Sequence, residues 1–187
     1  GIYRDLTNQD YLQYIANESF MKSVMKAEGV DYKKLIEIIP SNPIPNQSYK
    51  NNGQGNFAPF MNSGLATPGF SNGSAYADLD NDGDLDLVVN NVNMSCFVYE
   101  NKANELVKNS YLKIELLGLD KNPKGVGARV TATDGKQSWT YESQPTRGFQ
   151  SCMDSRINMG LGAATSVDVT VTWSSGKVSV LKNVKVN

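Results

Sequence analysis

The stretch "DLDNDGDLDL", from Asp78 to Leu87, carries aspartate at every second position and contains no lysine or arginine. The five acidic residues are Asp78, Asp80, Asp82, Asp84 and Asp86. Carboxylates at this density repel one another unless a cation lies among them. The spacing therefore predicts a metal site, and the alternative is a solvated acidic turn without metal.

Counted from Asp78, the stretch has the pattern D-x-D-x-D-G-x-x-D. Side chains at alternate positions can converge on one hard cation while Gly83 takes the sharp turn. The expected ligands are the carboxylates of Asp78, Asp80, Asp82 and Asp86, with the backbone carbonyl of Asp84. We expect calcium, because it accepts a flexible cage of oxygen ligands, whereas magnesium requires a stricter octahedral geometry.

The residues around the stretch exclude an EF-hand. Val89 stands where the EF-hand loop ends in a bidentate glutamate, and the flanking "AYADL" and "LDLVV" are typical of strands rather than helices. The site is therefore expected to clamp a β-hairpin, with a structural rather than a catalytic role.

The composition excludes several function classes. The 187 residues have a net charge of -1, without a basic patch for nucleic acid and without an apolar run long enough to span a membrane. The chain contains no histidine, which removes the commonest general base and the usual ligand of catalytic zinc. Cys96 and Cys152 could form a disulfide or be two small buried side chains, and the sequence leaves both open.

Helix signals are confined to the N-terminal part of the chain. A first helix is expected after a cap at Thr7 or Asn8 and is expected to end at Gly29. Asp31 can cap a second helix, which Pro40 ends, and "PSNPIPN" (40–46) reads as a linker. "SYKNNGQGNF" (48–57) is typical of a hairpin.

From residue 74 onward, short β-rich runs alternate with Gly, Asn and Asp. In "VDVTVTW", Val167, Val169, Val171 and Trp173 share one face, which we expect to be buried. The fold class is therefore mainly β, largely antiparallel, with an N-terminal helical segment.

Two known families share these motifs. "NQSYKNNGQGNF", "FSNGSAYADLDNDGDLDLVVNN" and "FVYEN" together resemble one blade of an FG-GAP/VCBS repeat, which builds β-propellers and carries such a calcium loop, as in integrin alpha chains. "NSYLKIELLG", "GVGARVTATDGK" and "GFQSCMDSRINMGLGAATSVDVTVTWSSG" resemble the ASPIC/UnbV domain, known from cartilage acidic protein and bacterial surface proteins. Ser174 departs from the family, which often has proline after the tryptophan.

The resemblance implies three parts: a helical segment and linker (1–45), a propeller-type blade with the calcium loop (46–103), and a β-sandwich-like ASPIC/UnbV domain (104–187). It also implies the C-terminal end of a longer exported protein, whose remaining propeller blades would be partners. The expected location is extracytoplasmic, secreted or anchored at the cell surface, in a bacterium.

The expected function is a non-enzymatic binding module for a glycan or a protein, without nucleic-acid binding and without a transmembrane segment. One alternative is a structural C-terminal cap of the propeller. Another is a carboxylate-dependent glycosidase, which would need two carboxylates about 5–9.5 Å apart in a cleft. An exposed binding loop of Trp139, Tyr141, Arg147 and Phe149 is a further alternative to packing of these residues in the core.

Overall fold

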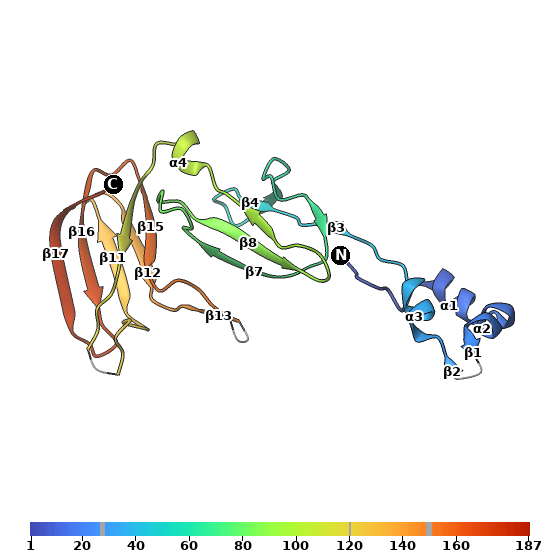
Figure 1. Ribbon diagram of the computed structural model, residues 1–187. Coiled ribbons are helices and arrows are strands. Elements are labelled where there is room, and N and C mark those ends of the chain that lie inside the picture. The colour runs from blue at the N-terminus through green and yellow to red at the C-terminus, as the bar shows by residue number, and fades with distance from the viewer. Residues whose placement is uncertain (27–28, 120, 149–150) are drawn as a thin grey trace. The chain divides into compact units, whose positions relative to one another are not determined.

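The computed structural model describes residues 1–26, 29–119, 121–148 and 151–187, and it is mainly β, as predicted (Figure 1). The chain forms two compact units. One contains residues 1–74 and 89–97, and the other contains residues 75–88 and 98–187. Among the described residues, no helix has both the length and the apolar character that crossing a lipid bilayer requires.

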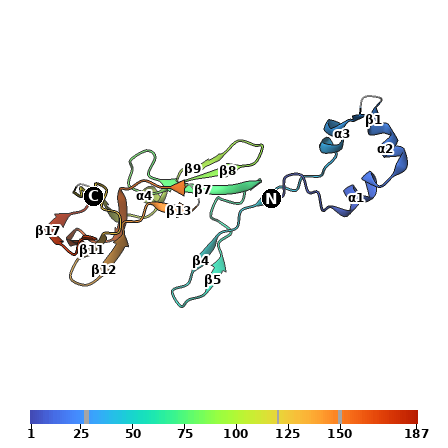
Figure 2. The same ribbon diagram turned by 90° about the horizontal axis from the view of Figure 1, so that it is seen from below.

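The first unit begins with three short helices, where the sequence predicted two. The helices are α1 (Gln9–Ile15), α2 (Glu18–Val24) and α3 (Tyr32–Glu37), and β1 (Met25–Lys26) pairs with β2 (Gly29–Val30) between α2 and α3 in the chain (Figure 2). The prediction of one helix up to Gly29 is wrong because the Asn17 side chain accepts hydrogen bonds from the N–H groups of Ser19 and Phe20 and begins a new helix. The predicted caps Asn8 and Asp31 are confirmed.

Two short antiparallel pairs follow in the same unit. Strand β3 (Ile44–Pro45) pairs with β6 (Pro68–Gly69), and β4 (Tyr49–Asn51) pairs with β5 (Phe57–Pro59). The second pair is the hairpin that "SYKNNGQGNF" predicted. Its strand residues are all exposed, so backbone pairing rather than burial defines it.

The aspartate stretch connects two strands of a three-stranded sheet. The sheet has the order β7 (Ser71–Ala77), β8 (Asp86–Asn91), β9 (Phe97–Tyr99), and the short helix α4 (Ala103–Leu106) follows. The aspartate stretch is thus the loop between β7 and β8, as the strand-like flanks predicted.

The second unit contains a β-sandwich. One sheet pairs β10 (Ser110–Ile114) with β15 (Ile157–Gly162). The other has the order β12 (Ser138–Glu142), β11 (Arg129–Thr133), β16 (Ser166–Thr172), β17 (Val178–Lys185), with every neighbouring pair antiparallel. Strand β13 (Thr146–Gly148) pairs with β14 (Ser151–Cys152) in a separate antiparallel ladder. These sheets form the β-sandwich-like domain that the ASPIC/UnbV resemblance implied.

The core of the sandwich follows from strand alternation. Its buried side chains are Leu116, Ala128, Val130, Ala132, Ile157, Met159, Leu161, Ala164, Val167, Val169 and Val171. The valines of β16 are buried, as "VDVTVTW" predicted, while Trp173 at the end of that face is half-buried. Its indole N–H donates to Ser179 Oγ at 2.9 Å, which satisfies the polar group at the edge of the core.

Both cysteines are free and exposed in the structure. The question that the sequence left open is thereby answered, since Cys96 and Cys152 neither form a disulfide nor lie in the core.

Candidate metal centre

The loop between β7 and β8 turns at two residues with left-handed backbone conformation. Asn81 has φ 64° and Gly83 has φ 100°. The Gly83 N–H donates to Asp78 Oδ2 at 3.0 Å, which closes the turn. A Cβ atom on Gly83 would lie 2.0 Å from the Tyr111 ring, so this position needs glycine for its φ and also for the space.

Three of the predicted ligand residues converge within the loop. One carboxylate oxygen each from Asp78, Asp80 and Asp82 lies within 4.8 Å of the others. The Asp78 side chain is 3% exposed, and within the described part of the chain its buried Oδ1 atom has no hydrogen-bond partner. An orphaned carboxylate oxygen beside two further carboxylates is the donor set that a hard divalent cation takes. The residues therefore fit a metal ion.

The other two predicted ligands, Asp84 and Asp86, lie outside this converging group. Asp86 is buried, and its two carboxylate oxygens accept the N–H groups of Leu79 and Asn101, each at 2.9 Å. Asp84 accepts the N–H of Asn104 on Oδ2 at 3.1 Å, while its buried Oδ1, like that of Asp78, has no hydrogen-bond partner among the described residues. The Leu79 bond closes the mouth of the loop, and the bonds from Asn101 and Asn104 attach its second half to the start of α4. Metal ligation by Asp84 and Asp86 stays a prediction.

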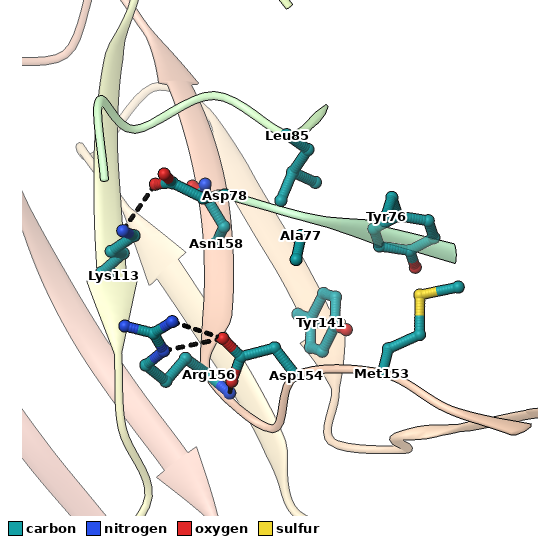
Figure 3. Close-up of a pocket in the computed structure, with 10 residues that line it drawn as sticks. All are labelled: Tyr76, Ala77, Asp78, Leu85, Lys113, Tyr141, Met153, Asp154, Arg156 and Asn158. Atoms are coloured by element: carbon teal, nitrogen blue, oxygen red, sulfur yellow. Dashed lines mark hydrogen bonds and ion pairs between the residues drawn. The ribbon is translucent and has the colours of Figure 1, made fainter. Parts of the chain in front are cut away.

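The β10–β15 sheet supplies residues that contact the loop from a distant part of the sequence. Lys113 on β10 places its ammonium 2.5 Å from Asp78 Oδ2 (Figure 3). The same ammonium donates to Asn81 Oδ1 at 3.2 Å. Asn158 on β15 donates from Nδ2 to the Gly83 carbonyl at 2.9 Å. The aspartate loop thus rests on one face of a two-stranded sheet.

Local charges set the protonation of the cluster. Burial raises the pKa of Asp78, but the hydrogen bonds from Lys113 and the Gly83 N–H outweigh it and hold that pKa below its ordinary value. At Asp80, partial desolvation and the neighbouring charges of Asp82 and Asp86 raise the pKa. A repelled carboxylate at Asp80 is one that a cation would stabilise.

A cavity of about 140 Å³ adjoins the loop (Figure 3). Its lining combines the aromatic and apolar side chains of Tyr76, Ala77, Leu85, Tyr141 and Met153 with the polar Asp78, Lys113, Asp154, Arg156 and Asn158. Asp154 is bound through its Oδ2 atom by the guanidinium of Arg156 at 2.6 Å and 2.8 Å. This hydrogen-bonded ion pair lowers the pKa of Asp154 and raises that of Arg156.

The residues of the aromatic-basic loop suggested by the sequence, Trp139, Tyr141, Arg147 and Phe149, do not form one exposed binding loop in the described part of the chain. Arg147 donates from Nε and Nη2 to the hydroxyls of Tyr76 and Tyr141, each at 3.2 Å. Trp139 and Tyr141 are half-buried and pack against the core of the sandwich. Phe149 lies outside the described residues.

Sequence analysis missed the residues that complete the site, namely Tyr111, Lys113, Asn158 and Asn104. The alternation of β10 places Tyr111 and Lys113 on one face, opposite Leu112 and Ile114, which pack against the core. The alternation can be read from "YLKI" in the sequence, but the sequence could not show which residues the outward face of β10 contacts. Only the antiparallel register, which pairs Lys113 with Asn158, brings the two residues together under the loop.

Two family models match the chain. An FG-GAP-like repeat matches residues 38–89, which include β7, the aspartate loop and most of β8. A second model, described as ASPIC and UnbV, matches residues 118–187 and covers all four strands of the larger sheet, together with β15. No curated protein matches the chain. Both resemblances drawn from the sequence motifs are confirmed.

Proposed function

Because the chain combines an FG-GAP-like repeat with an ASPIC/UnbV domain, we propose that it is a calcium-stabilised, non-enzymatic interaction module of an exported protein. An FG-GAP repeat implies that the module is part of a larger repeat protein, and such repeats are typical of extracellular proteins. The remaining blades of a propeller, a glycan or another protein are its proposed partners, at the surface of a bacterium or secreted from it.

The observation that carries the calcium assignment is the buried, unpartnered Oδ1 atom of Asp78 beside the carboxylates of Asp80 and Asp82. We assign Asp78, Asp80 and Asp82 as carboxylate ligands and keep the Asp84 carbonyl and Asp86 as further candidates. A bound calcium ion would supply charge neutralisation, and the loop would join β7 to β8 more firmly.

Calcium is expected to raise the stability of the protein. Calcium in about hundredfold excess over the dissociation constant adds about 2.7 kcal/mol to the free energy of unfolding, since only the folded loop gathers the ligands. The measurement is thermal unfolding in calcium, in magnesium and in a chelator. Calcium should raise the Tm more than magnesium does. Equal Tm values in calcium and in chelator would contradict the assignment.

The variant Asp80→Asn tests the site without disturbing the core, because Asp80 is exposed. We expect the Tm in chelator to stay unchanged or to rise slightly, because one repelling charge is removed, and the calcium affinity to fall about tenfold. Glu142→Gln is the matched control, since it removes one exposed carboxylate from β12, outside the acidic cluster.

The cavity beside the loop supports binding rather than acid catalysis. A glycosidase needs a carboxyl group whose pKa is raised, so that it can donate a proton. The two carboxylates that line this cavity, Asp78 and Asp154, have pKa values lowered by hydrogen bonds from Lys113 and Arg156.

Incubation of the purified protein with an oligosaccharide array tests this choice. We expect retention without cleavage, measured by surface binding and by chromatography of the supernatant. Released sugar products that disappear in Asp154→Asn would make the protein an enzyme and would overturn the proposal.

A further inference from the structure

The two oxygens of the Asp78 carboxylate have different surroundings. Oδ2 accepts the Gly83 N–H at 3.0 Å and contacts the Lys113 ammonium at 2.5 Å. Oδ1 is buried and unpartnered within the described residues. A metal ion bound through Oδ1 would therefore share one carboxylate with a lysine whose contact is made on the other oxygen.

Lys113 is held in this place by the sheet beneath it. Its side chain is 24% exposed, and its ammonium also contacts Asn81 in the same loop. Its partner across the sheet, Asn158, donates to the Gly83 carbonyl, while Tyr111 on the same face of β10 packs against Gly83. Three contacts thus hold the loop over β10 and β15. Loss of the Lys113 ammonium would leave the buried Asp78 carboxylate without its ionic partner.

We propose that Lys113 is an internal competitor of the metal, whose ammonium neutralises the empty loop and lowers the loop's affinity for calcium. The inference rests on the proposed calcium site. Two cations that share one carboxylate repel each other, and the low exposure of Lys113 limits screening by salt. The empty loop stays folded because Lys113 balances part of its charge, and the site fills only where calcium is abundant.

The variant Lys113→Met removes the ammonium and keeps the side-chain length. We expect its calcium affinity, measured by isothermal titration calorimetry, to rise about tenfold or more. Even in water, the repulsion between a single and a double positive charge a few ångströms apart is large enough to change a dissociation constant by about this factor. Its Tm in chelator should fall, because Asp78 loses a partner. The stabilisation that calcium adds should grow, because the tighter binding increases its contribution at a given calcium concentration. Lys124→Met is the control, since it removes an exposed lysine of the same unit that lines no part of the cavity.

Lys113→Gln is a second variant for the case that Lys113→Met does not fold, because the glutamine amide is uncharged but can still donate a hydrogen bond to Asp78. It should also bind calcium more tightly than the wild type. Calcium binding by either Lys113 variant but not by the wild type would support the competition. If the wild type binds calcium and both variants bind it equally or more weakly, the inference about Lys113 is wrong while the calcium site stands. If no variant binds calcium, the calcium site itself is refuted, and the inference with it.

Discussion

Replacing Gly83 by alanine is expected to lower the free energy of unfolding by about 2–6 kcal/mol, even in the absence of metal. Two costs add at this position. A φ of 100° is strained for any residue with a Cβ atom, and that atom would lie 2.0 Å from the Tyr111 ring. Pairing of β10 with β15 holds the Tyr111 backbone, so the ring itself would have to rotate to make room. Urea unfolding in chelator measures the loss.

Two further variants separate these costs. Gly135 has φ 87° and nothing within 4 Å of its Cβ position, so Gly135→Ala reports the backbone strain alone, about 1–3 kcal/mol. In a Tyr111→Ala background, Gly83→Ala should cost about as little as Gly135→Ala does, because the ring that it strikes is gone. An equal cost of Gly83→Ala with and without Tyr111 would show that the steric account is wrong.

The parts of the fold that the sequence predicted well are those set by local period and spacing. The alternation in "VDVTVTW" identified the buried face of β16, and the flanks of the aspartate loop identified β7 and β8 as strands. Capping residues such as Asn8 and Asp31 act on the N–H groups of the next few residues, so they too are readable from the chain alone. The converging trio Asp78, Asp80 and Asp82 follows from the same short-range logic.

The parts that it could not predict depend on contacts between distant segments. Asn17 has the same capping chemistry as Asn8, but whether a helix breaks there depends on tertiary packing, which competes with continuation of the helix. Lys113 lies 35 residues after Asp78, and only the folded sandwich brings its ammonium to the loop. The composition of the loop alone suggested that a metal was the sole source of positive charge, whereas the structure adds a lysine.

Asp86 shows how one acidic motif divides into two kinds of carboxylate. It stands in the same alternating series as Asp78, Asp80 and Asp82, yet its two oxygens accept the N–H groups of Leu79 and Asn101. One bond spans the mouth of the loop, and the other attaches the loop to the residues before α4. Since both oxygens already accept backbone N–H groups, Asp86 is expected to stabilise the protein through these bonds whether or not the loop holds a metal.

Asp86→Ala is accordingly expected to cost about 2–6 kcal/mol in chelator, because it leaves two partly buried N–H donors without their acceptor. Asp86→Asn should cost less, since its amide oxygen can still accept one of the two bonds. Asp80→Asn, which changes an exposed carboxylate of the same loop, should cost nothing under these conditions. The measurement is denaturant unfolding of the three variants in chelator and again in excess calcium. A loss for Asp86→Ala that is absent in chelator and present only in calcium would show that Asp86 acts as a metal ligand instead, and the loop would then hold its shape through the ion rather than through backbone hydrogen bonds.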